Sequence, residues 1–372
     1  MSFMKPTALL LSVLFGAIIT LRSAETPPPA RTNQRPVPVR SPEVNGDHQV
    51  TFRLRAAKAA KVAVIGQWTN GAAPMARDSN DVWSVTVGPI ATGIWEYGFQ
   101  VDELSMIDPG NPAIKPMREP RTSILHLPGD PPLVWDFQEG PHGVVREHTY
   151  RAKALGRLRG LTVYTPPGYD QNRKTYPTLY LQHGSGDNQN TWTVHGKAHW
   201  ILDNLIAEGR AKPMIIVMMD GHAATPGAPG DNTRLFERDL LEEVMPFIKA
   251  NYRVKQGAAN RAIVGLSMGG GQSLTIGLNH ADTFAWVGGF SSATPSAESV
   301  ATALNDSQAL NKKLKLLWIA CGKEDFLRQR NEEFRALLNA KSVKCEWHPT
   351  AGNHSWPIWR GYLADIVPKL FQ

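Results

Sequence analysis

Cysteine is scarce in this sequence. The 372 residues contain two, Cys321 and Cys345, which is too few for a disulfide scaffold or a cysteine-based metal site. Each stands in an apolar stretch with the pattern of a strand. We therefore expect a buried pair of free thiols, with one disulfide as the alternative.

Apolar runs of membrane-spanning length are also lacking. The run at residues 8–21 is shorter than the about 20 residues of a spanning helix. It follows Lys5 and precedes Ala24, which is typical of a secretory signal peptide over residues 1–24. The sequence thus predicts a secreted protein, extracellular or periplasmic, that is not held at a membrane after cleavage. Because Arg22 stands at the minus-three position of the cleavage site, an uncleaved anchor is the alternative.

Runs of basic residues are missing too. The net charge is +7, but Lys and Arg are scattered along the chain, so no nucleic-acid-binding surface is indicated. His195, His199 and His222 lack the pairwise spacing of a metal site and look incidental, so we expect no metal and no other cofactor. The oligomeric state is left open.

The length of the chain favours two domains. Residues 25–45 are rich in proline and polar side chains, which predicts an extended linker. From residue 49 onward, apolar and polar residues alternate in short runs separated by turn residues. This pattern predicts a small all-β, immunoglobulin-like sandwich over residues 46–130, with the proline-broken segment 108–132 lying across a surface. Trp68, Trp83 and Trp95 in this region are candidates for stacking on sugar rings, but core positions are the commoner case.

Residues 131–372 have a different pattern, in which fully apolar runs alternate with amphipathic helical segments. It indicates an α/β fold with a mostly parallel central sheet covered by helices on both faces. The expected strands are 157–164, 178–182, 214–219, 262–266, 286–290, 314–320 and 343–347, and the expected helices include 200–208, 331–340 and 235–250, the last broken at Pro246.

The stretch Gly265-Leu-Ser-Met-Gly269 follows an apolar run and precedes a small-residue helical segment. Strand, G-x-S-x-G turn and helix together make the nucleophile elbow of serine hydrolases. Side chains at Gly265 and Gly269 would collide across so tight a turn. We expect Ser267 to be the nucleophile and the backbone N–H of Met268 to be one oxyanion donor.

A serine nucleophile needs a base and an orienting acid. In proteins with this elbow, the acid and then the histidine follow the serine along the chain. Asp325 stands just after the strand expected at 314–320, and His354 stands after the strand expected at 343–347. Glu324 is the alternative acid. The second oxyanion donor is expected in the small-residue loop after residues 178–182, at the backbone N–H of Gly184 or Ser185.

Four motifs in this order, at residues 182–192, 265–270, 321–326 and 352–360, resemble carbohydrate esterase family 1, which includes feruloyl esterases and acetyl xylan esterases and is similar to esterase D. The preceding segment resembles the family 48 carbohydrate-binding, early-set β-sandwich. The resemblance implies an α/β-hydrolase domain over residues 131–372 with Ser267 as nucleophile, His354 as base and Asp325 as acid. It also implies that the loop after His183 forms half of the oxyanion hole.

The resemblance implies an enzyme that hydrolyses feruloyl esters on plant cell-wall xylan, or on its oligosaccharides, through an acyl-enzyme on Ser267. Trp192, Trp356 and Trp359 are then candidates for the wall of an apolar acyl pocket. The alternatives are an acetyl xylan esterase, an enterochelin-esterase-like hydrolase and, outside the enzymes, an inactive glycan-binding protein.

Overall fold

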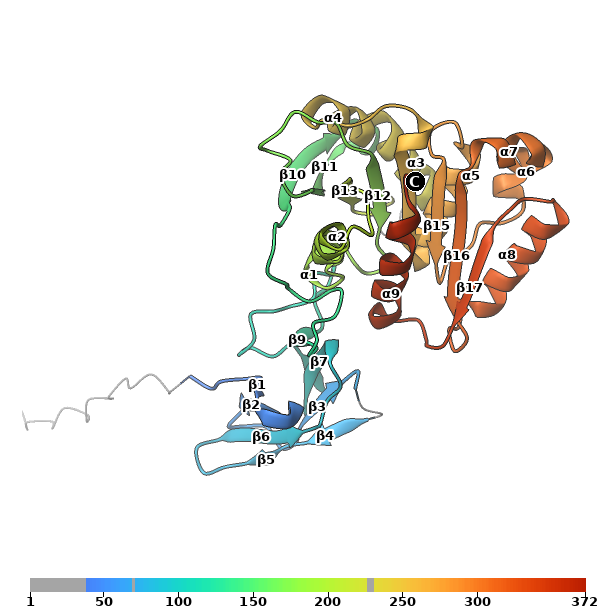
Figure 1. Cartoon of the computed structure of the whole chain (residues 1–372). Coiled ribbons are helices and arrows are strands. Elements are labelled where there is room, and N and C mark those ends of the chain that lie inside the picture. The colour runs from blue at the N-terminus through green and yellow to red at the C-terminus, as the bar shows by residue number, and fades with distance from the viewer. Residues whose placement is uncertain (1–37, 69–70, 226–230) are drawn as a thin grey trace, which may run out of the picture. The chain divides into compact units, whose positions relative to one another are not determined.

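The computed structural model describes residues 38–68, 71–225 and 231–372 (Figure 1). The predicted signal peptide and most of the predicted linker lie outside the described residues. Within them, no helix is long and apolar enough to cross a membrane.

The N-terminal β-sandwich consists of two antiparallel sheets. One has the order β1-β2-β6-β5, and the other has the order β4-β3-β7-β8 with β9 also paired to β7. The strands are β1 (Glu43–Val44), β2 (Val50–Arg55), β3 (Val62–Gly66), β4 (Ala72–Pro74), β5 (Ala76–Arg77), β6 (Val82–Val87), β7 (Gly93–Val101), β8 (Leu104–Met106) and β9 (Ser123–Leu127).

Alternating residues of these strands form the core of the sandwich. Phe52, Val64 and Phe99 are buried between the sheets, and the ring of Tyr97 lies 4.9 Å from that of Phe52. Trp83 also belongs to this core, where its indole N–H donates a hydrogen bond to a backbone carbonyl. The apolar side chains therefore alternate because one face of each sheet is covered by the other.

Two expectations about the edges of the sandwich were wrong. β1 lies in the region expected to be linker, because it pairs with β2. The segment 108–132 contains β9, which pairs along β7 instead of only crossing a surface. Asp108 anchors this segment, since its buried carboxylate accepts hydrogen bonds from Ser41 and Tyr97.

The second sheet has eight strands in the order β10-β11-β13-β12-β14-β15-β16-β17. They are β10 (Val144–Ala152), β11 (Arg157–Thr165), β12 (Thr178–Gln182), β13 (Ile215–Met219), β14 (Arg261–Leu266), β15 (Trp286–Phe290), β16 (Leu316–Gly322) and β17 (Glu346–Thr350). β10 and β11 are antiparallel to their neighbours and the remaining pairs are parallel. The mostly parallel sheet is thus confirmed. β10 was not predicted, because an edge strand exposed on one side has no continuous apolar run.

Helices cover both faces of this sheet. The α-helices are α1 (Thr191–Val194), α2 (Ala198–Ala207), α3 (Asn232–Asp239), α4 (Met245–Asn251), α5 (Ser267–Asn279), α6 (Ala301–Asn305), α7 (Ser307–Lys313), α8 (Arg328–Ala340) and α9 (Trp356–Ile366). A π-helical turn (Leu240–Val244) joins α3 to α4, and short 3₁₀ turns lie at Gly46–His48, Lys153–Leu155, Ala258–Asn260, Glu298–Val300 and Val367–Lys369. The expected break at Pro246 takes this form, with the proline in the first turn of α4.

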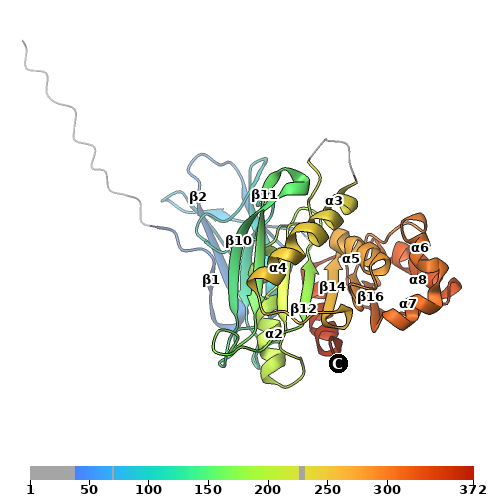
Figure 2. The same ribbon diagram turned by 90° about the horizontal axis from the view of Figure 1, so that it is seen from above.

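Two hydrophobic clusters lie on the two faces of the sheet. One contains side chains of α3, α4, α5 and α8, and the other contains side chains of α2 and α9. Figure 2 shows α3, α4 and α5 together on one side of the strands and α2 on the other. The central strands β12, β13, β15 and β16 are buried on both sides, which explains their unbroken apolar sequences.

The register of the sheet brings several strand ends to one edge. Gln182 pairs with Gly265, Leu266 pairs with Phe290, and Gly322 pairs with Thr350. The loops that carry the predicted site residues therefore begin side by side at the carboxyl edge.

Cys321 and Cys345 are both free, although only Cys321 is buried, so the expected buried pair was half right.

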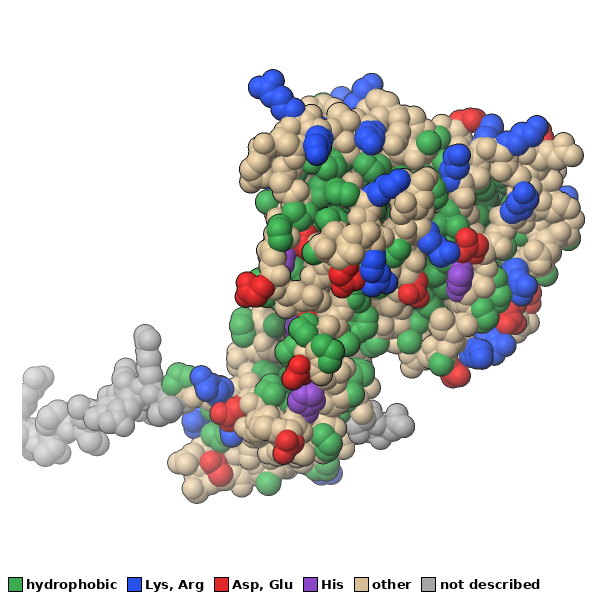
Figure 3. Space-filling view, viewed as in Figure 1, with side chains coloured by type: hydrophobic (Ala, Val, Ile, Leu, Met, Phe, Trp, Pro, Cys, Tyr) green, Lys and Arg blue, Asp and Glu red, His purple; other side chains and the backbone are tan. Residues whose placement is uncertain are grey.

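On the face shown in Figure 3, the Lys and Arg side chains are spread over the surface without one dense patch.

Candidate active site

Ser267 lies at the sharp turn between β14 and α5. Its φ of +52° is in the left-handed region, which a residue with a side chain occupies only under strain. At Gly265 and Gly269, which flank this turn, any side chain would clash with the backbone. A Cβ on Gly265 would lie 2.3 Å from the carbonyl oxygen of Gly269, and one on Gly269 would lie 2.3 Å from that of His183.

Ser267, His354 and Asp325 come from three separate loops and form a hydrogen-bonded chain. Oγ of Ser267 lies 3.0 Å from Nε2 of His354, and Nδ1 of His354 lies 2.9 Å from Oδ2 of Asp325. Because the carboxylate accepts the Nδ1 proton, Nε2 is free to accept the proton of the serine hydroxyl. This is the arrangement of a nucleophile, a general base and an orienting acid.

Asp325 is buried, and burial by itself would raise the pKa of its carboxyl group. The hydrogen bonds from His354 and Ser291 and from the backbone of Leu327 outweigh burial and lower this pKa below its ordinary value. The alternative acid, Glu324, points elsewhere: its Oε2 accepts a hydrogen bond of 2.5 Å from the amide of Gly352. Asp325 therefore orients the imidazole, and Glu324 holds the loop on which His354 stands.

The expected oxyanion donors lie around Ser267. A Cβ on Gly184 would be 3.3 Å from Cβ of Ser267, so this glycine is in close contact with the nucleophile. Within the described residues, the amides of Gly184 and Ser185 have no hydrogen-bond acceptor. Met268 is in the first turn of α5, where amides lack intrahelical acceptors and the helix dipole is positive. Unpaired amides beside the serine are what a developing oxyanion needs.

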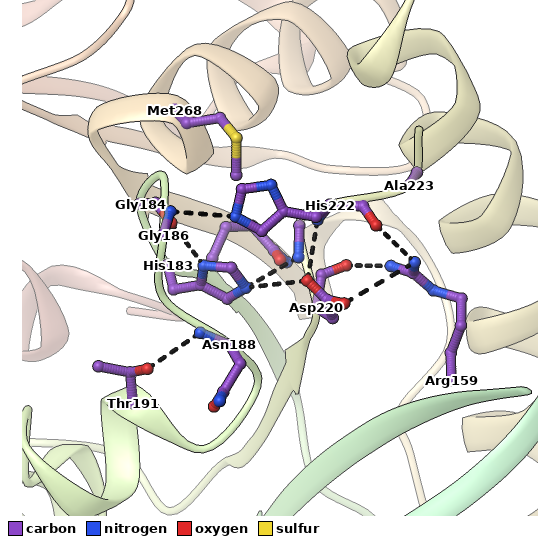
Figure 4. Close-up of polar contacts among 12 residues, drawn as sticks. Arg159, His183, Gly184, Gly186, Asn188, Thr191, Asp220, His222, Ala223 and Met268 are labelled. Carbon is purple, nitrogen blue, oxygen red and sulfur yellow. Dashed lines mark hydrogen bonds and ion pairs between the residues drawn. The ribbon is translucent and has the colours of Figure 1, made fainter. Parts of the chain in front are cut away.

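Two histidines hold the loop Gly184–Asp187, which we call the oxyanion loop. Nδ1 of His183 donates to the carbonyl oxygen of Gly184 at 2.7 Å, while its Nε2 accepts from the amide of Gly221 at 2.8 Å. Nε2 of His222 accepts from the amide of Gly186 at 3.1 Å. Figure 4 shows the two imidazoles next to the loop. His222 is therefore not incidental, and that expectation was wrong, because spacing along the chain does not show which backbone amide a ring faces.

The turn that carries His222 follows β13 and is itself held by Arg159. The buried guanidinium donates to the carbonyl oxygen of His222 at 2.8 Å and lies 2.9 Å from the Asp239 carboxylate (Figure 4 shows the former contact). The side-chain amide of Gln272 donates, through Nε2, to the carbonyl oxygen of Gly221 at 2.9 Å. The oxyanion loop is thus connected through His222 to the core of the domain.

The proposed acyl-pocket wall of three tryptophans is not supported by their positions. Trp192 and Trp356 are almost fully buried, and the indole N–H of Trp192 donates to the carbonyl oxygen of Gln182. Trp359 packs edge-on against the ring of His354 with centroids 4.8 Å apart, and its N–H donates to Ser291. All three side chains belong to the hydrophobic core, Trp192 from α1 and the other two from α9.

Phe326 is an exposed aromatic residue at the site that the sequence analysis did not single out as a binding residue. Its side chain is 76% exposed, and its ring centroid lies 4.4 Å from that of His354. A large exposed aromatic ring beside a catalytic histidine is available to a planar ligand. Its place directly after Asp325 was the available signal.

A cavity of about 590 Å³ borders the oxyanion loop. Its lining residues are Met117, Arg118, Glu119, Arg121, Ser185, Gly186 and His222. The residues 117–121 come from the segment that precedes β9, so both halves of the chain contribute to the space beside Ser185.

The doubly covered, mostly parallel sheet and the Ser–His–Asp chain at its carboxyl edge define an α/β-hydrolase. Residues 152–370, more than half of the chain, match the Esterase family model, and residues 40–115 match carbohydrate-binding module 48, the isoamylase N-terminal domain. The chain therefore belongs to the Esterase family and carries an N-terminal domain of the carbohydrate-binding module 48 type. The resemblance seen in the sequence is confirmed.

Curated and solved relatives agree with this assignment. The chain is 32% identical over 341 residues to an endo-1,4-beta-xylanase/feruloyl esterase of Xylanibacter ruminicola, covering 89% of this chain and 46% of that protein. It thus spans less than half the length of this curated relative. A CE1 ferulic acid esterase from Anaeromyces mucronatus is 26% identical, with a TM-score of 0.56 over 64% of this chain and 94% of that chain. The enterobactin esterase of Shigella flexneri, at 19% identity, shares the fold over 87% of this chain and 93% of its own with a TM-score of 0.63.

Proposed function

We propose that this protein is a serine esterase that releases feruloyl groups from plant cell-wall xylan or its oligosaccharides. The hydrogen-bonded chain from Ser267 through His354 to Asp325 is the observation that carries the proposal. The names of the Xylanibacter and Anaeromyces relatives support the feruloyl ester as the substrate. The match to carbohydrate-binding module 48 supports a polysaccharide as the partner.

The geometry supports a two-step acyl transfer. His354 accepts the proton of Ser267 as the serine oxygen attacks the ester carbonyl carbon, and the amides of Met268 and of Gly184 or Ser185 stabilise the oxyanion. The sugar alcohol leaves with the proton from His354. Water, deprotonated by His354, then attacks the acyl-enzyme, releases the carboxylic acid and restores the serine hydroxyl.

Two surfaces next to the triad suit the two parts of such an ester. The exposed ring of Phe326 offers a stacking surface for a planar hydroxycinnamoyl group. The polar cavity beside Ser185 has room for a sugar, since about 590 Å³ is within the range of ligand sites.

Secretion is a further part of the proposal. It is supported by the apolar run at residues 8–21 after Lys5, a pattern typical of an export signal. Mass spectrometry of the N-terminus of the protein recovered from the producing cell's exterior would test it, with an N-terminus near residue 25 as the expected result.

The proposed reaction is tested by initial rates on methyl ferulate and on acetylated xylan with residues 25–372 and with Ser267→Ala. We expect release of ferulate that the variant loses. Release of acetate with negligible turnover of ferulate would transfer the assignment to an acetyl xylan esterase. Binding of xylan without serine-dependent turnover of either ester would contradict the esterase assignment and favour a glycan-binding protein.

A further inference from the structure

A group of buried charges lies behind the oxyanion loop. Nζ of Lys115 is 3.1 Å from Oε1 of Glu96 and 3.3 Å from Oδ1 of Asp187, and the three side chains are only 8%, 12% and 5% exposed. Buried charges are costly unless each has a partner of opposite sign. Lys115 is the cation that both carboxylates share, so their positions depend on it.

Asp187 belongs to the oxyanion loop, and the segment around Lys115 runs along that loop. The amide of Asp187 donates to the carbonyl oxygen of Gly184 at 3.3 Å, and Met117 forms an antiparallel bridge with Asp187. The amide of Arg118 donates to the carbonyl oxygen of Gly186 at 2.9 Å. A shift of Asp187 would therefore move the peptide groups of Gly184 and Ser185.

The electrostatics of the group require the lysine charge. Burial raises the pKa of Asp187, as does the nearby Glu96 carboxylate, while Lys115 acts in the opposite direction. Burial alone would also raise the pKa of Glu96, but the contact with His195 and the charge of Lys115 lower it to about 2. Without Lys115, the buried carboxylate of Asp187 would be left near the buried carboxylate of Glu96 with no lysine between them. Asp187 would then take up a proton or move away.

The same part of the β-sandwich also contacts α9, the helix that begins two residues after His354. The buried Arg360 of α9 donates to the carbonyl oxygen of Ile94 in β7 at 2.7 Å and to that of His195 at 3.1 Å. Nε2 of His195 in turn lies 3.3 Å from Oε1 of Glu96. The charged group therefore lies between the oxyanion loop and the helix behind the catalytic histidine.

We propose that Lys115 is a positioning residue of the active site. Its ion pair with Asp187 holds the oxyanion loop so that the amides of Gly184 and Ser185 face the oxygen that becomes negative during attack by Ser267. The inference rests on the oxyanion hole proposed above, but not on the choice of acyl group. It gives the N-terminal half of the chain a role in catalysis that is separate from glycan binding.

The test compares Lys115→Met, Lys115→Arg and Lys369→Met in the full chain, with p-nitrophenyl acetate as substrate. We expect Lys115→Met to lower kcat about 100-fold, the loss typical of a 1 Å misplacement, while KM changes little. Lys115→Arg keeps the charge and restores most of the rate. Lys369 controls for the loss of a lysine ion pair elsewhere, since it pairs with Glu346 at 3.0 Å on the surface, and the Tm values show what removal of the buried Lys115 charge costs in stability.

A second measurement separates positioning from folding. Benzeneboronic acid forms a tetrahedral adduct with a serine nucleophile, so its affinity should fall in parallel with kcat in Lys115→Met. Asp187→Asn should show the same loss, and the double variant Lys115→Met/Asp187→Asn should lose no more than the worse single variant, because both act through one contact. Tm values recorded for all variants show whether each is folded.

The proposal is overturned if folded Lys115→Met keeps its kcat and boronate affinity, if the loss lies in KM alone, or if Lys369→Met loses as much. Should Lys115→Met not fold, Asp187→Asn and the double variant decide by the same two readouts. Turnover of p-nitrophenyl acetate without turnover of methyl ferulate would contradict the feruloyl assignment and leave this test intact.

Discussion

The amide of Gly186 in the oxyanion loop donates a hydrogen bond of 3.1 Å to Nε2 of His222, in the turn that follows β13. Only a neutral imidazole offers that lone pair. Burial lowers the pKa of His222 to about 4, and the neighbouring His183 adds to this effect. His222 therefore remains an acceptor at neutral pH.

This relationship predicts how stability depends on pH. The folded-state pKa of His222 is about 4, below the roughly 6.5 of an unfolded histidine, so the unfolded state binds the proton first. The contribution is fully present above about pH 6.5 and is lost as the pH falls towards about 4. Tm measured between pH 7.5 and 4.5 should thus fall more steeply in the wild type than in His222→Gln, whose neutral amide does not titrate. Parallel curves would contradict the assigned role.

The acid assignment predicts unequal effects for adjacent carboxylates. Asp325→Asn removes the acceptor that fixes the Nδ1 proton of His354, so kcat should fall by about 10⁴-fold, as for other triads that lose the correct tautomer. Glu324→Gln is the matched control, since its amide oxygen still accepts from Gly352, and we expect a loss of less than about tenfold. Initial rates on methyl ferulate at saturating substrate measure both. A larger loss in Glu324→Gln than in Asp325→Asn would reverse the assignment.

A glycine of the elbow, Gly269, should not tolerate a side chain, whereas Gly361 in α9 should. In Gly269→Ala the new Cβ would meet the carbonyl oxygen of His183 at 2.3 Å, and overpacking of this kind costs about 1–3 kcal/mol. In Gly361→Ala, within α9, the new methyl group meets nothing within 4 Å, and alanine favours a helix by roughly 0.5–1 kcal/mol. Thermal denaturation should show a lower Tm for the first variant and a slightly higher one for the second. Equal Tm values would contradict the steric conflict at Gly269 and show that the turn can accommodate a Cβ there.

Much of this architecture could be predicted because its causes are local. The glycines of the elbow are dictated by a turn of five residues, and the acid follows β16, whose two-sided burial leaves an unbroken apolar sequence. Asp325 was predicted from its position after that strand, and His354 from its position after the next strand, the edge strand β17. β10 was not predicted, because an edge strand keeps polar residues on its exposed face and so lacks an unbroken apolar sequence.

The remaining parts of the site depend on contacts between distant segments, which spacing does not show. His222 acts on Gly186, and Lys115 acts on Asp187, through approaches that only the folded chain creates. The tryptophans were misplaced for a related reason: aromatic residues near a catalytic motif can face either the ligand or the core. Here α1 places Trp192 in the core, and α9 places Trp356 and Trp359 there. A motif identifies the reacting groups more readily than the residues that position them.

Phe326 gives the sharpest prediction about the substrate. Its ring is 76% exposed beside His354, and stacking of an aromatic ligand on such a ring contributes about 0.5–1.5 kcal/mol. In Phe326→Ala, KM for methyl ferulate should therefore rise by up to about tenfold, while KM for p-nitrophenyl acetate stays within about twofold if the nitrophenyl group leaves on the other side of the bond. Phe326→Tyr keeps the stacking surface and is the control that should retain both values. A similar rise of KM for both esters would show that Phe326 affects access to Ser267, and an unchanged KM for methyl ferulate would place the acyl group on another surface of the site.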